Sequence, residues 1–171
     1  RIAADIPAAL LKDPAGLQTF LVQRPILQLM FNGGIRAAGP DGKGIASVPF
    51  SEDRISASYM DRDYMIGALK EGKSTIGRPV LGRVLRAPVI GMAVPIRDSK
   101  GLIVGALVGV INLGKPNFLD RVTESRFSKT GGYLVIAPQY QLIVTATNKN
   151  RIMQPAPPPG VPPAISGVVD R

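Results

Sequence analysis

The strongest hydrophobic pattern lies in the middle of the chain. Between residues 89 and 96, larger apolar side chains occupy every second position, namely Ile90, Met92, Val94 and Ile96. This alternation predicts a strand with one buried face. The opposite face carries Gly91 and Ala93, whose small size leaves room either for a ligand or for a closely packed helix. Residues 102–113 are apolar on both faces, which predicts the central strand of a sheet, and the turn at 98–101 makes the two strands an antiparallel hairpin.

A helix and another hairpin are predicted before this region. Asp13 and Pro14 form a helix start, with Asp as the cap and Pro at the first helical position. An apolar stripe follows, and Pro25 is predicted to end that helix. Residues 35–38 and 45–48 flank the turn 39–42 and predict the first hairpin.

Two further helices are predicted on either side of the long hairpin. One covers about 61–70, with Met65, Ile66 and Leu69 facing inward and Gly72 as its C-terminal cap. The other begins at Pro116 and buries Phe118, Leu119 and Val122.

The pattern also predicts the domain organisation. Residues 1–25 form an N-terminal helical segment, 26–128 a first lobe, and 129–171 the start of a second. The last part has two predicted strands, 133–137 and 142–146, and an extended Pro-rich tail at 154–163. Two strands and a tail bury too little apolar area for a core of their own. We expect this part to pack on the first lobe or to belong to a lobe that continues outside the chain.

Composition excludes several function classes. The chain has no His and no Cys, which argues against a zinc, copper or haem site and against Ser-His or Cys-His catalysis. There is no clustered pair of carboxylates either, so we expect no catalytic residue, no metal and no cofactor. The longest apolar run, 101–114, is too short to span a bilayer.

A net charge of +9 favours an anionic partner. Because the basic residues are scattered and the aromatics comprise only five Phe and four Tyr with no Trp, we do not expect nucleic-acid binding. A solvated basic surface remains the alternative.

Several segments together resemble one known family. They are Asp61-Arg62-Asp63-Tyr64 before a helix, Gly77-Arg78-Pro79 in a loop, the hairpin from Pro88 to Leu113, and Thr130-Gly131-Gly132-Tyr133 opening a later strand. In this order and spacing, the chain resembles the double-Cache extracytoplasmic sensor domains of bacterial diguanylate cyclases, chemoreceptors and sensor kinases. The resemblance covers roughly residues 15–150, and no single motif in it is specific. Asn32-Gly33-Gly34 and Arg151-Ile152-Met153 are most similar to the cyclase-linked members.

The resemblance implies an α+β, PAS-like Cache fold: an antiparallel sheet, a long N-terminal helix and two lobes, with ligand bound in the membrane-distal one. That lobe looks complete over about 26–114, whereas the membrane-proximal lobe looks truncated. The implied function is small-molecule sensing in the periplasmic part of an inner-membrane protein, with a diguanylate cyclase as the first choice of output. A chemoreceptor, a histidine kinase or a non-binding dimerisation scaffold are the alternatives. Anchoring would come from flanking helices outside this chain, and homodimer formation stays open.

The resemblance also implies a ligand site. Its candidate residues are Tyr59, Arg62, Tyr64, Arg86, Met92 and Asn112. At least one arginine among Arg78, Arg83 and Arg86 should face the ligand.

Each candidate has a structural alternative. Arg62 adjoins Asp61 and Asp63, so a local ion pair is equally expected. Tyr59 and Tyr64 could be core aromatics, and Asn112 could bind backbone.

The sequence departs from the amino-acid-binding branch of the family in two places. Met65 replaces a second aromatic. The predicted strand 102–113 has Val110, Ile111 and Asn112 near its end but no carboxylate there. An α-ammonium group would therefore lack its charge partner. We expect an anionic or neutral polar ligand, because Arg62 can clamp a carboxylate with two hydrogen bonds.

Overall fold

The structure, a computed structural model, describes residues 2–124 and 132–158. The chain divides into two compact units, the first ending at Phe118 and the second beginning at Leu119. The expected lobe boundary after residue 128 lies outside the described residues.

The N-terminal segment consists of short helices. A 3-10 helix, η1 (Ala8–Lys12), is followed by α1 (Pro14–Val22) and α2 (Pro25–Met30). Asp13 caps α1 as predicted, since its side chain accepts a 3.0 Å hydrogen bond from the Gly16 amide. Pro25, predicted only to end a helix, also starts the next one. One long helix is not formed, because proline supplies no amide hydrogen for an unbroken helical ladder.

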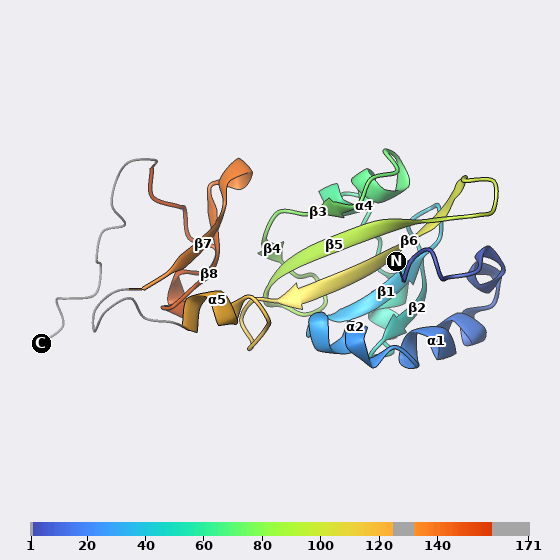
Figure 1. Cartoon of the computed structure of the whole chain (residues 1–171), viewed down its shortest axis with the longest axis horizontal. Coiled ribbons are helices and arrows are strands. Elements are labelled where there is room, and N and C mark those ends of the chain that lie inside the picture. The colour runs from blue at the N-terminus through green and yellow to red at the C-terminus, as the bar shows by residue number, and fades with distance from the viewer. Residues whose placement is uncertain (1, 125–131, 159–171) are drawn as a thin grey trace, which may run out of the picture. The chain divides into compact units, whose positions relative to one another are not determined.

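The first unit is built on an antiparallel sheet, in the order β2-β1-β6-β5-β3 (Figure 1). Its strands are β1 (Gly34–Ala38), β2 (Gly44–Val48), β3 (Thr75–Ile76), β4 (Val80–Leu81), β5 (Pro88–Arg97) and β6 (Ile103–Asn112). The short β4 pairs with β5 off this path. Both predicted hairpins and the central place of β6 are confirmed, and so is the α+β, PAS-like fold class.

The two faces of the sheet carry different layers. On one face, Leu17 and Leu21 of α1 pack against Ile35 of β1, Ile96 of β5 and Leu107 of β6. On the other face lies α4 (Asp63–Leu69), which contacts β3, β5 and β6 (Figure 1). Since successive strand residues point to opposite faces, each strand divides its side chains between these layers.

The core beneath α4 is made of small and medium side chains. Tyr64, Met65 and Ala68 of the helix are buried against Ala93 of β5 and Val108 of β6. The predicted cap at Gly72 is present, with a φ of 67°. A further short helix, α3 (Glu52–Ser56), lies against β2 and was not predicted, and neither was α2.

In the second unit, β7 (Leu134–Ala137) and β8 (Leu142–Ala146) pair antiparallel, as predicted. They are packed against α5 (Asp120–Glu124) and accompanied by the 3-10 turns η2 (Pro138–Tyr140) and η3 (Lys149–Arg151). The helix predicted from Pro116 thus begins later, and the predicted burial of Phe118 and Val122 is wrong, since both are exposed. Of the Pro-rich tail, residues 159–163 lie outside the described part.

Across residues 2–124 and 132–158, every helix is too short or too polar to cross a bilayer.

Candidate ligand-binding pocket

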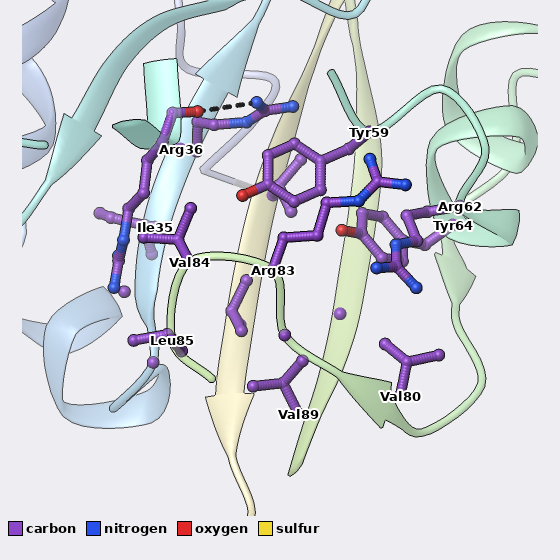
Figure 2. A pocket seen from close by; sticks show the side chains of 17 residues that line it. Ile35, Arg36, Tyr59, Arg62, Tyr64, Val80, Arg83, Val84, Leu85 and Val89 are labelled. Atoms are coloured by element: carbon purple, nitrogen blue, oxygen red, sulfur yellow. Dashed lines mark hydrogen bonds between the residues drawn. The ribbon is translucent and has the colours of Figure 1, made fainter. Parts of the chain in front are cut away.

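A pocket lies on the α4 face of the sheet, within the first unit. Val89 and Gly91 of β5 and Val108 and Val110 of β6 form an apolar floor. The loop 82–87, between β4 and β5, borders the pocket with Val84 and Leu85 (Figure 2). The pocket holds about 600 Å³ of space, part of which is open solvent.

Tyr64 presents a polar group to this apolar floor. The residue is only 7% exposed, and its ring lies directly on Gly91, where a Cβ atom would come within 2.7 Å of the ring carbon Cζ. The hydroxyl has no hydrogen-bond partner among the described residues and points into the pocket (Figure 2). Burial raises the pKa of Tyr64 to about 12. The hydroxyl therefore stays protonated at physiological pH and is available to donate to a ligand.

Arg36 brings a buried positive charge to the pocket. It stands on β1 and is 6% exposed. Its guanidinium donates to three backbone carbonyls, those of Arg54, Ala57 and Gly42, at 3.1, 3.1 and 3.2 Å. It also lies 4.4 Å from the centre of the Tyr59 ring. Burial lowers the pKa of Arg36, although the neighbouring Tyr64 and Tyr59 work in the opposite direction.

Two further arginines line the pocket, Arg62 at the start of α4 and Arg83 in the loop 82–87. The Arg62 side chain is 14% exposed, and its Nε atom is 3.8 Å from a carboxylate oxygen of Asp61. Arg83 binds the same oxygen at 2.8 Å and donates to the Ser58 carbonyl at 2.5 Å. Asp61 is thus shared by two arginines, and both of them line the pocket.

Arg54, on α3, completes the set of cations. Its guanidinium lies against the backbone of Gly34, where a Cβ atom would collide with it. Burial lowers the pKa of Arg54, with an opposing effect from Tyr59. Among the residues that line the described pocket there are four arginines and no Asp or Glu.

Three of the six candidate residues line this pocket, and three do not. Tyr59, Arg62 and Tyr64 lie together around it (Figure 2). Met92 falls on the opposite face of β5, because its neighbours Gly91 and Ala93 face α4.

The other two candidates, Arg86 and Asn112, lie outside the pocket lining and form hydrogen bonds with nearby backbone groups. Arg86 is exposed and adopts a left-handed conformation, with φ at 50°, and its amide donates to the Gly82 carbonyl. Asn112 is buried at the end of β6, and its side-chain oxygen accepts from the Gly114 amide at 3.0 Å.

The sequence interpretation missed Arg36, Arg54 and the apolar tip of the loop. For Arg36 a signal existed, since a charged residue within the apolar stretch 35–38 needs a special environment if that strand is buried. For Arg54 there was none, because its approach to Gly34 joins segments that are separate in sequence. Arg83 is the loop arginine that turns toward the pocket, from the three that were considered.

Together, the sheet and the helices on its two faces define an α+β domain with a PAS-like fold, and a pocket lies on its α4 face. No protein-family model and no curated protein matches this sequence. The particular proteins that it resembles were found among solved structures.

Two of these are amino-acid chemoreceptor domains of Pseudomonas. The ligand-binding domain of PctB from Pseudomonas aeruginosa, in complex with L-Arg, has a TM-score of 0.67 and 20% sequence identity, and covers 90% of this chain and 64% of its own. The ligand-binding domain of the Pseudomonas fluorescens chemoreceptor CtaA, in complex with L-serine, has a TM-score of 0.66, 19% identity, and coverages of 90% and 63%. The present chain therefore spans a little under two thirds of their length.

A third solved structure binds a different ligand. It is the ligand-binding domain of PctC from Pseudomonas aeruginosa in complex with GABA, with a TM-score of 0.66, 16% identity, and coverages of 94% and 73%. At such identities the likeness establishes the fold. All three structures are ligand-binding domains of chemoreceptors.

Proposed function

We propose that this chain is the extracytoplasmic, ligand-sensing part of a bacterial transmembrane signalling protein. The pocket would bind a small molecule through Arg62 and the Tyr64 hydroxyl, with Tyr59 beside them. The observation that carries this proposal is that a nearly buried tyrosine hydroxyl and an arginine face one pocket over an apolar floor. A few polar groups placed around an apolar cavity are typical of a binding site.

Two kinds of output fit the domain. The chemoreceptor alternative is supported by the three solved structures described above, each of which comes from a chemoreceptor. The diguanylate-cyclase alternative rests on the sequence resemblance at Asn32-Gly33-Gly34 and Arg151-Ile152-Met153. In both cases anchoring would come from flanking helices, and binding would shift the balance between two signalling states.

A thermal-shift screen over organic acids, amines, amino acids and nucleobases tests ligand sensing. A ligand that binds only the folded state raises the apparent stability by RT ln(1 + [L]/Kd), or about 2.7 kcal/mol at one hundred times Kd. We expect at least one compound to raise Tm in a concentration-dependent way. If none does, the alternative of a non-binding scaffold is favoured.

Replacing Arg62 with Ala tests the site itself. A hydrogen bond to a charged group contributes about 1.5–3 kcal/mol, so affinity for the identified ligand should fall roughly 10- to 150-fold. Stability should change little, because the contact of Arg62 with the exposed Asp61 is long. Isothermal titration calorimetry and urea unfolding measure the two effects.

Arg78→Ala is the matched control. Arg78 is exposed and does not line the pocket, so its removal takes away the same charge without touching the site. Equal affinity of the Arg62→Ala variant and the parent would contradict the proposed site.

A further inference from the structure

The charges around the pocket are strongly unbalanced. Four arginines are among its lining residues, and the carboxylate of Asp61 contacts two of them, Arg62 and Arg83. Asp61 is occupied by Arg83 and lies farther from Arg62. A half-buried positive charge without a nearby negative one is costly, and burial lowers the pKa of both Arg36 and Arg54 accordingly.

The four cations come from two separate parts of the fold. Arg36 and Arg54 belong to β1 and α3, where the Arg54 carbonyl accepts a hydrogen bond from Arg36. Arg62 and Arg83 come from the start of α4 and the loop 82–87, where they share Asp61. Val89, Val108 and Val110 form the apolar floor of the pocket. The arginines of the pocket thus come from two parts of the fold, and its floor is apolar.

The described lining of the pocket offers no carboxylate that would pair with an ammonium group. No Asp or Glu lines it within the described residues, and on β6 the side chains that line it are those of Val108 and Val110. An ammonium placed here would be desolvated beside like charges, which is unfavourable.

These features carry an inference that rests on the proposed function and narrows it. We infer that the ligand is an organic acid with two carboxylate groups on a short aliphatic chain and no ammonium group. One carboxylate binds Arg62 and the Tyr64 hydroxyl, the other binds Arg54, and the chain between them lies on the valine floor. Bidentate pairing with guanidinium groups is well suited to carboxylates.

Three probes that differ by one group each test this inference. Glutarate has two carboxylates, L-glutamate adds only an α-ammonium, and butyrate lacks one carboxylate of glutarate and keeps its other four carbons. Calorimetric titration of the whole chain at pH 7 should show glutarate binding at least tenfold more tightly than either of the others. Succinate and adipate, titrated in parallel, allow for a different spacing of the two carboxylates.

The variant Arg54→Ala supplies a readout that a purely structural role would not move. We expect this variant to bind the dicarboxylates at least tenfold more weakly than the parent does, and butyrate less than threefold more weakly. The preference for two carboxylates would then be lost. Arg78→Ala should leave that preference as in the parent. A melting curve for each variant checks that it is folded.

The outcomes separate this inference from the proposed function. The two-carboxylate inference is wrong, and the proposed sensing function stands, if L-glutamate or butyrate binds as tightly as the best dicarboxylate. The same conclusion follows if only a different class of compound binds and Arg62→Ala abolishes that binding. The inference is also wrong if Arg54→Ala keeps the full preference. If no compound in any class binds, the proposed function fails as well.

Discussion

At the scale of single residues, the alternation of side chains along β5 decides which of them face the pocket. Val89, Gly91 and Ala93 face α4, whereas Met92 and Ile96 face the N-terminal helices. Gly91 matters most, because its missing side chain lets the Tyr64 ring lie flat on the strand. The position of the Tyr64 hydroxyl therefore depends on a glycine in the floor of the pocket.

We predict that Gly91→Ala displaces Tyr64 and abolishes ligand binding. The added Cβ would lie within 2.7 Å of the ring carbon Cζ, so the buried ring must move. Overpacking of this kind costs about 1–3 kcal/mol of the free energy of unfolding, measurable by urea denaturation. As a control, Gly114→Ala should be tolerated, since its nearest neighbouring atom would be 3.4 Å away. Parental affinity in Gly91→Ala would show that the position of Tyr64 is not critical.

Part of this candidate site could be predicted from the sequence. Tyr59, Arg62 and Tyr64 precede or begin the predicted helix, and the resemblance placed them at a pocket that the structure contains. Met92 could have been excluded from the alternation alone, since a strand cannot point positions 91 and 92 to the same side. The approach of Arg54 to Gly34 depends on tertiary contacts that no local pattern encodes.

At the scale of elements, long strands were predictable and short helices were not. The predicted strand 102–113 differs from β6 by one residue at each end, because its apolar pattern extends over many positions. Helices α2 and α3 have six and five residues, too few for a helical period to show. Their signals were at their starts, with Pro25 at the first position of α2 and Ser51 capping α3.

The loop 82–87 is an element with its own internal support. The Gly82 amide donates to the Ala87 carbonyl and the Arg86 amide to the Gly82 carbonyl, both at 2.9 Å. Arg83 then ties the loop to Ser58 and Asp61 on the far side of the pocket. The loop tip, with Val84 and Leu85, is thereby held at the pocket.

We predict that Arg83→Ala loosens this loop without destabilising the fold. An exposed ion pair contributes only about 0–1 kcal/mol to stability, whereas the loop loses both of its side-chain contacts to Ser58 and Asp61. Hydrogen exchange at residues 83–86 should accelerate, and bound ligand should dissociate faster. Lys73→Ala, which removes another exposed ion pair, serves as the control. Unchanged exchange in the loop would mean that Arg83 does not hold it.

At the scale of the whole molecule, the pocket belongs to one unit alone. Its lining residues run from Gly33 to Val110, and all of them precede the division after Phe118. Both hydrophobic clusters of the sheet also lie in the first unit. In the second unit, Asp120 of α5 binds Lys149 and Thr145, so that this helix is tied to β8.

That division predicts where the chain can be cut. A chain ending after Phe118 should fold and bind ligand with an affinity within about threefold of the whole chain, because the sheet, α4 and the loop remain complete. A cut near Arg126 should be less favourable, since it keeps α5 but removes the strands it packs on and leaves Asp120 without Lys149. Circular dichroism, thermal melting and calorimetric titration of both truncated chains measure the difference. An unfolded or non-binding chain of residues 1–118 would show that the second unit is needed to complete the sensor.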